Sequence, residues 1–124
     1  MKLLVLFSWA GLLSLHYLGV FKNLNVSLSF YDMVLHFLGG ALASLTIIVF
    51  FKNRGISRPV FVFTAVMIIG VFWEIFEMLI DIFMTPNFHF PINMRNVSDS
   101  LSDLFFDGLG SVFLIIISNA FRKH

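Results

Sequence analysis

Residues 59–84 read PVFVFTAVMIIGVFWEIFEMLIDIFM, a run that is apolar along most of its length and acidic only toward its end. A helix of about 20 mainly apolar residues crosses a bilayer. Pro59 suits the first turn of such a helix, because its missing N–H costs nothing there. The stretch therefore predicts a transmembrane helix, and it places the carboxyl groups of Glu74, Glu77 and Asp81 inside the predicted span.

Three other stretches have the length and apolar character of membrane spans: residues 3–21, 32–51 and 98–121. Ser98 is a suitable N-cap for the last of them. The connections are short, so we expect one all-α integral membrane domain over residues 1–124, built as a single four-transmembrane-helix bundle. The first span is open to interpretation as a signal peptide with Lys2 as its basic flank, but no Ala-x-Ala type cleavage site follows it, which favours a retained helix.

The composition agrees with a membrane protein. The chain is 59% hydrophobic and 12% charged, whereas soluble domains are about 45–50% apolar and about 25% charged. Its net charge of +1 gives no case for nucleic-acid binding. Cysteine is absent, which excludes a disulfide framework and thiolate chemistry.

The basic residues predict the orientation of the bundle, because Lys and Arg are enriched in cytoplasmic segments. In a four-span topology, Lys22 and Arg95 fall on one side of the membrane. The other six basic residues fall on the side of the chain termini: Lys2, Lys52, Arg54, Arg58, Arg122 and Lys123. This asymmetry predicts that both termini are cytoplasmic.

All seven acidic residues lie in the outer half of this topology. Residues three, four or seven apart share one face of a helix. The acidic residues and one histidine follow that spacing in three helices, so that each helix presents a single polar stripe: Asp32 and His36; Glu74, Glu77 and Asp81; Asp99, Asp103 and Asp107. Gly39, Ala43 and Gly110 continue two of these stripes, and small residues favour close helix packing in membranes. The stripes should therefore face the interior of the bundle.

The helix directions predict which members of the stripes lie at the same depth. The span 59–84 runs outward and the span 98–121 runs inward, so the expected levels are Asp81 with Asp99, Glu77 with Asp103, and Glu74 with Asp107. The span 32–51 also runs inward, which adds Asp32 to the first level and His36 to the second. Four of the seven acidic residues are thereby predicted to surround His36 or to lie one turn below it.

The free-energy cost of placing these charged carboxyl groups within the membrane indicates a function. One charged residue at the bilayer centre costs roughly 2.5–3.5 kcal/mol, so several approach the whole stability of a domain, about 5–15 kcal/mol. A bound cation, protonated carboxyls or a water-filled cavity would lower this cost. Carboxylate and imidazole ligands together suit a divalent metal ion such as Mg, Mn, Fe or Zn. The candidate metal ligands are His36, Glu74, Glu77, Asp103, Asp32, Asp99 and Asp81.

Each candidate also has a simpler interpretation. The stripes can act as polar contacts between helices that share protons, and Asp81 and Asp99 can be interfacial. Asp32, one turn before His36, would orient the ring of His36 for metal binding; in the simpler interpretation His36 is a core histidine whose hydrogen bonds are satisfied. His16 has no partner in the sequence and is expected to be structural. Arg95 is a candidate for holding an anionic substrate group, but it can equally pair with Asp99 or with lipid headgroups.

Several catalytic motifs are missing from the sequence. There is no Gly-x-Ser-x-Gly elbow and no His-Glu-x-x-His, so serine hydrolase and zincin chemistry are unsupported. The Glu-x-x-His pair of di-iron bundles is also absent. If the site is catalytic, Asp107 and Glu74 are the candidates for the reacting base or ligand.

Three segments resemble known small membrane proteins. Residues 31–37 (YDMVLHF) resemble the Asp-x-x-x-His-Phe element of VanZ-like proteins, and residues 73–77 (WEIFE) resemble the Glu-x-x-Glu segment of the YjdF-like family. Residues 103–110 (DLFFDGLG) resemble the VanZ-like Asp-x-x-x-Asn-x-x-Gly ending, with Asp107 where Asn is usual. Asp99 with Asp103 also looks like the paired Asp of the YjdF-like group. The resemblance covers roughly residues 31–115.

The resemblance implies a multi-pass protein of a prokaryotic plasma membrane. VanZ-like proteins are associated with resistance to glycopeptide antibiotics at the cell surface, so a lipid or lipid-linked envelope substrate is the implied partner, beside the membrane lipids. The carboxylate of Asp107 adds a possible metal ligand and weakens the transfer from VanZ itself. Two alternatives remain at this stage: a transporter or a proton or ion relay component without enzymatic activity, and a small membrane scaffold protein.

Overall fold

The computed structural model describes residues 1–22, 29–51, 58–84 and 94–122. These residues form four helices, α1 (Lys2–Phe21), α3 (Ser29–Phe51), α4 (Pro59–Met84) and α5 (Met94–Arg122), and they contain no strand. Each helix includes a segment long and apolar enough to cross a membrane. The all-α, four-span architecture predicted from the sequence is therefore confirmed.

Two helices begin earlier than the hydropathy pattern indicates. The helix α3 starts at Ser29, before Asp32, and α5 starts at Met94, four residues before Ser98. The added turns include polar residues, Ser29 in α3 and Arg95 and Asn96 in α5, which lower the mean hydropathy at these ends. Ser98 therefore lies inside the first turns of α5 instead of capping it.

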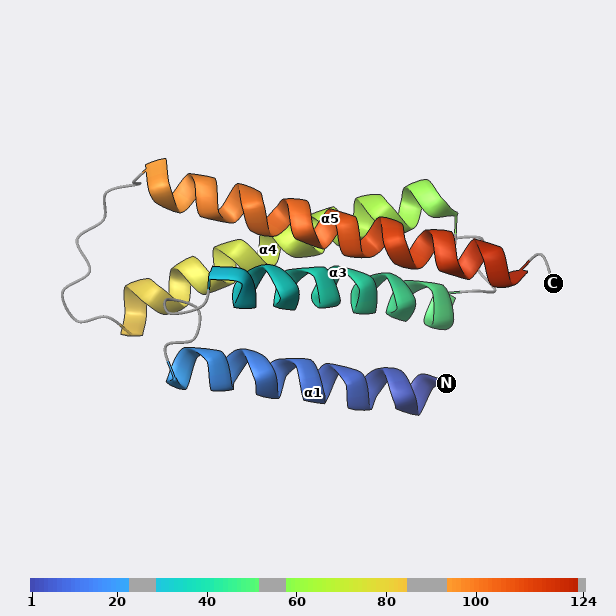
Figure 1. The fold of residues 1–124 in the computed structure, drawn as a ribbon, viewed down its shortest axis with the longest axis horizontal. Coiled ribbons are helices and arrows are strands. Elements are labelled where there is room, and N and C mark those ends of the chain that lie inside the picture. The colour runs from blue at the N-terminus through green and yellow to red at the C-terminus, as the bar shows by residue number, and fades with distance from the viewer. Residues whose placement is uncertain (23–28, 52–57, 85–93, 123–124) are drawn as a thin grey trace.

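The helix α3 lies at the centre of the bundle (Figure 1). It makes its most extensive contact with α5, and it also packs against α1 and α4, while α4 makes a second contact with α5. The beginning of α1 and the end of α5 lie at the same end of the bundle. The other three helices thus surround α3, which carries His36.

Glycine residues set the close approach of α3 and α5. A Cβ atom on Gly40 would collide with the backbone of Asp107, and one on Gly110 would collide with the backbone of Phe37. One turn further along, Ser44 Oγ donates a 2.7 Å hydrogen bond to Ser111 Oγ, and both residues are fully buried. Small and hydroxylated residues at such a contact are typical of helix packing in membranes.

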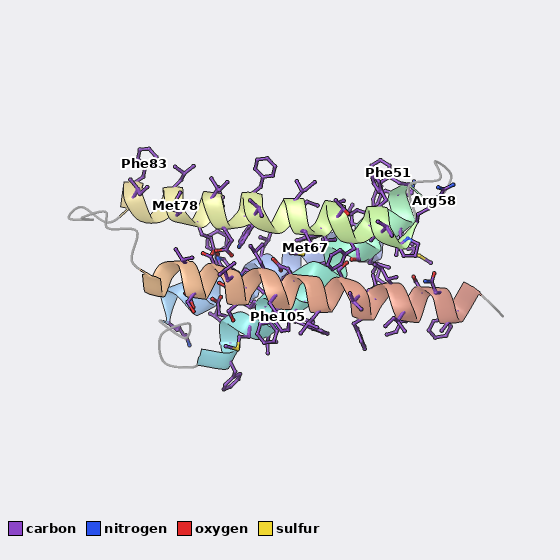
Figure 2. All side chains as sticks on the ribbon, turned by 90° about the horizontal axis from the view of Figure 1, so that it is seen from above. Phe51, Arg58, Met67, Met78, Phe83 and Phe105 are labelled. Carbon is purple, nitrogen blue, oxygen red and sulfur yellow. The ribbon has the colours of Figure 1, made fainter. Side chains whose placement is uncertain are left out.

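Apolar side chains divide between a small core and a large outer surface. The core cluster consists of Ala43, Ile47, Val62 and Val66, which belong to the second half of α3 and the first turns of α4. Large apolar side chains stand outward around the helices, as Figure 2 shows for Phe83 and Phe105, which are 82% and 61% exposed. A soluble monomer rarely exposes so much apolar surface, whereas lipid would cover it.

Candidate metal site

The imidazole of His36 occupies the centre of the polar half of the bundle. His36 lies one turn after Asp32 and one turn before Gly40 on α3, so the face that packs closely against α5 also carries the ring. Only 6% of the residue is exposed. Burial of an imidazole at this depth requires polar partners for both ring nitrogens, and carboxyl groups of α4 and α5 lie near them.

Asp107 is the partner of the first ring nitrogen. Its Oδ1 lies 3.3 Å from His36 Nδ1, and the residue is itself 6% exposed. This contact favours the tautomer in which Nδ1–H donates to the carboxylate and Nε2 carries the free lone pair. A carboxylate behind the ring is the usual arrangement for a metal-ligating histidine. Asp107 thus takes the orienting position that the sequence suggested for Asp32.

The second ring nitrogen faces two carboxyl groups from different helices. His36 Nε2 lies 3.9 Å from Asp103 Oδ2 on α5 and 4.0 Å from Glu74 Oε1 on α4. Glu74 Oε1 is buried and has no hydrogen-bond partner among the described residues. An unsatisfied buried carboxyl oxygen beside an imidazole lone pair is costly, and a cation between the two atoms would satisfy both.

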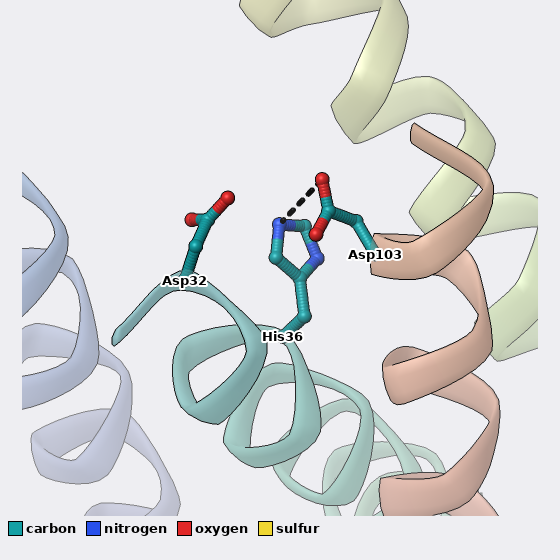
Figure 3. Close-up of side chains that lie close together, drawn as sticks. All are labelled: Asp32, His36 and Asp103. Carbon is teal, nitrogen blue, oxygen red and sulfur yellow. Dashed lines mark ion pairs between the residues drawn. The ribbon is translucent and has the colours of Figure 1, made fainter. Parts of the chain in front are cut away.

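The donor atoms fall into two overlapping groups that share His36. One group joins His36 with Asp32 and Asp103 (Figure 3), and the other joins it with Glu74 and Glu77. Within each group the candidate ligand atoms lie within 4.8 Å of one another. The structure therefore brings five of the candidate ligands into two groups that meet at His36: His36, Asp32, Asp103, Glu74 and Glu77.

The spacing of these atoms suits a metal ion after small movements. Zn–N and Zn–O bonds are about 2.0–2.2 Å long. His36 Nε2 is separated by 3.9 Å from Asp103 Oδ2 and by 4.0 Å from Glu74 Oε1. Ligands in a tetrahedral site lie about 3.3 Å apart at these bond lengths, so the carboxylates would have to close in by less than about 1 Å.

A second histidine, His16, contacts a carboxyl group of the cluster, and the sequence did not indicate this contact. His16 Nε2 of α1 lies 3.4 Å from Glu77 Oε1 on α4, and its ring meets that of Trp73 edge to face. Trp73 Nε1–H donates to the same Glu77 oxygen at 2.9 Å. Glu77 is thus held between α1 and α4. His16 was expected to be structural because it has no partner in the sequence. Its partner is revealed only by the side-chain contact that spans from α1 to α4.

The comparison with known proteins bears on the whole chain. Residues 2–124 match the model of a family described as "Predicted membrane protein (DUF2238)". The chain belongs to this family. No curated protein and no solved structure matches it significantly. Membership of DUF2238 confirms the expected class, a membrane protein, while the resemblance to VanZ-like and YjdF-like proteins stays a prediction.

The remaining candidate residues of this DUF2238 protein lie at the edge of the carboxylate cluster around His36 or have side chains that the structure does not describe. Asp99 is exposed on the first turns of α5 and belongs to neither ligand group. The side chains of Asp81 and Arg95 lie outside the described part of the structure, so their predicted roles remain predictions. Asp32 is half-buried and lies one turn before His36, in the first turn of α3.

Electrostatics adds to the case for a cation in this DUF2238 protein. Among the side chains that the structure describes, the only partners of these carboxylates that can carry a positive charge are two histidines, His36 and His16. Five carboxyl groups (Asp32, Glu74, Glu77, Asp103 and Asp107) face two imidazoles, an excess of three (five minus two) even if both rings are charged. Such an excess inside a membrane is stabilised by bound cations or by protons.

Proposed function

We propose that this protein binds a divalent metal ion in the half of the bundle that lies away from the chain termini. His36 Nε2, Glu74 and Asp103 are the proposed ligands, with Glu77 and Asp32 completing the shell. Asp107 orients the imidazole through Nδ1. The observation that carries the proposal is the buried Glu74 Oε1, which has no hydrogen-bond partner among the described residues and faces the imidazole nitrogen at 4.0 Å.

The proposed role of the site is to bind or process an amphiphilic molecule of the membrane. A divalent cation held there would supply Lewis acidity toward a phosphoryl or carbonyl oxygen and would lower the pKa of a bound water. Glu74 would accept the proton of that water, and Arg95 would hold the anionic group of the substrate. Asp107, the other base that the sequence suggested, lies at Nδ1 on the far side of the ring from the proposed metal. Lipid or lipid-linked envelope molecules of a prokaryotic plasma membrane are the proposed partners.

A proton or ion relay is the alternative, and one observation argues against it. The polar residues continue inward from Asp107 for one more level, to the hydrogen-bonded pair Ser44 and Ser111. Beyond that pair the described core cluster is apolar, and the part-buried hydroxyls of Thr46 and Ser118 donate to backbone carbonyls of their own helices. A relay would need polar groups across this region, and acid-driven ion uptake into proteoliposomes would be required to favour it.

Elemental analysis of the purified protein tests the metal site. Wild type, Asp103→Asn and Glu74→Gln are loaded with Mg²⁺, Mn²⁺, Fe²⁺ or Zn²⁺ in turn, passed through a desalting column and measured by mass spectrometry. We expect near-stoichiometric metal in wild type and a loss of most of it in both variants, because each removes one charged ligand. Equal metal content in all three proteins would refute the assignment.

Asp99→Asn is the matched comparison for these variants. It makes the same chemical change on the same helix, four residues before Asp103, but at an exposed position. We expect it to retain the metal of the wild type. If it loses metal as Asp103→Asn does, the ligand set extends to the outermost level that the sequence predicted.

A further inference from the structure

A cavity of about 90 Å³ lies between α1 and α4, and α3 forms its base. Leu12 and Leu13 line it from α1, and Ile69 lines it from α4. The backbone of α1 packs against α3 alone among the described helices. The cavity is therefore the space that remains where α1 and α4 flank α3 without packing directly on each other.

Small residues of α3 keep this space open. Gly39, Gly40 and Ala43 line the cavity. Gly40 is required by the contact with α5, but a Cβ atom on Gly39 would meet only Asp107 Oδ1 and Leu12 Cδ2, both at 3.8 Å, which is ordinary contact. Helix packing therefore does not demand glycine at position 39. Its effect is to leave volume that a side chain would otherwise fill.

The cavity is polar at one end and apolar along the rest. His16, His36 and Asp107 line the end that adjoins the candidate metal site, and Trp9, Ala43 and Val66 line the opposite end. The N–H of Trp9 is used by Thr46 Oγ1 at 2.9 Å, and that of Trp73 is used by Glu77. Both indoles therefore present their apolar surface to an occupant.

The cavity borders on the surface that lipid covers. Leu13 and Ile69, on opposite sides of it, are 38% and 46% exposed. One water molecule needs about 10–15 Å³ on this measure of volume, so the 90 Å³ cavity holds several heavy atoms. That is room for a segment of one hydrocarbon chain, not for a whole lipid.

We infer that this cavity binds a segment of one hydrocarbon chain of a membrane amphiphile, whose polar end lies at His36 and Asp107. The orientation of the cavity agrees with that of a membrane lipid. The polar end of the cavity lies away from the chain termini, and its apolar end lies deeper in the bundle. A lipid of the adjacent leaflet has the same direction, with its headgroup outward and its chain toward the midplane. The inference deepens the proposed function and rests on it for the chemistry at the polar end, but chain binding itself requires no metal.

Photo-crosslinking from a lipid chain tests this inference. The protein is placed in nanodiscs that contain phosphatidylethanolamine with a diazirine in one acyl chain, and the labelled residues are identified by mass spectrometry. Bulk lipid labels exposed residues such as Ile116, which is 63% exposed. Ala43 and Val66 are 4% and 2% exposed, so their labelling reports a chain inside the cavity.

Two variants fill the cavity from different sides, and each has a matched control. Gly39→Leu fills it from α3, and Gly11→Leu makes the same change where a Cβ atom meets nothing within 4 Å. Leu13→Trp fills it from α1, and Leu15→Trp makes the same change at a position that does not line it. We expect labelling of Ala43 and Val66 to fall at least about tenfold in both filled variants, because the burial of several methylenes is lost, and to persist in both controls.

The outcomes separate the chain site from the metal site. Wild-type labelling of Ala43 and Val66 at background, or labelling that survives both filled variants, would overturn the chain site. Metal content is measured on the same proteins. If the chain site is overturned but the Leu13→Trp protein still binds metal, the metal site remains supported. Conversely, crosslinking that persists in the Asp103→Asn protein without metal would support the chain site alone. Competition by unlabelled phospholipid or by a polyprenyl phosphate distinguishes the two sources of such a chain.

Discussion

At the scale of single residues, the two nitrogens of His36 have different surroundings. Nδ1 has one carboxylate partner at 3.3 Å, whereas Nε2 has two carboxyl oxygens near 4 Å. The shorter contact orients the ring, and the longer ones leave space between the ring and the carboxylates. This asymmetry separates the predicted effects of the neighbouring acidic residues, because Asp107 acts on the ring and Asp103 and Glu74 act on the metal.

Substitution of Asp107 tests its orienting role. We expect Asp107→Ala to lower metal affinity about 10–100-fold, the usual effect of removing the carboxylate behind a metal-bound imidazole. Asp107→Asn should have a smaller effect, because the amide oxygen still accepts from Nδ1–H. Metal titrations of detergent-purified protein measure both affinities. If the asparagine variant bound as weakly as the alanine variant, the charge of Asp107 and not its hydrogen bond would be the important property.

At the scale of helices, the spacing of polar residues predicted which residues of α3 and α5 face each other, but it did not predict the contact that α1 makes with the cluster. The i, i+4 pattern placed Asp32, His36, Asp103 and Asp107 on the facing sides of α3 and α5, where the structure has them. The sequence suggested Asp32 as the residue that orients His36, whereas the structure places Asp107 at Nδ1, because the partner depends on the rotation of α5 against α3. It could not predict the His16–Glu77 contact either, since nothing in α1 indicates that it lies beside α4.

Of the adjacent glycines Gly39 and Gly40, only Gly40 is required by the close contact between α3 and α5. We expect Gly40→Ala to destabilise the protein by about 1–3 kcal/mol or more, because its methyl group would overlap the backbone of Asp107. Gly39→Ala is the control, since its methyl group meets only ordinary contacts at 3.8 Å and gains the same helix propensity, about 1 kcal/mol.

Thermal unfolding in detergent measures both glycine variants, and the metal content of the folded fraction is measured beside it. A melting temperature that falls for Gly40→Ala and not for Gly39→Ala would support the close contact. Equal melting temperatures would mean that α3 and α5 can separate without cost, which the buried hydrogen bond between Ser44 and Ser111 argues against.

At the scale of the whole molecule, length and hydropathy were enough to predict four membrane helices, and the structure confirms them. They did not predict which helices are neighbours, because each helix is apolar on most of its surface. The cavity between α1 and α4 was therefore invisible in the sequence. It arises from the arrangement of three helices, and the only local indication was the small residues of α3.

The orientation of the bundle decides which leaflet supplies a ligand to the polar end, and the two ends of α4 offer a direct test. Its 26 residues span about 39 Å at about 1.5 Å per residue, which exceeds the hydrocarbon thickness of about 30 Å. Val60 and Phe83 lie near its two ends and are 78% and 82% exposed. The chain contains no cysteine, so Val60→Cys and Phe83→Cys each introduce a single thiol and leave every Lys and Arg in place.

The excess of basic residues on the side of the termini predicts the result. In intact bacterial cells that express each variant, we expect a membrane-impermeant maleimide to label Phe83→Cys and to leave Val60→Cys unlabelled until the cells are permeabilised. The reverse pattern would place both termini outside the cell, and the carboxylate cluster would then face the cytoplasmic leaflet. A cell-surface substrate would be excluded in that case, whereas the metal and chain sites would remain open to lipids of the inner leaflet.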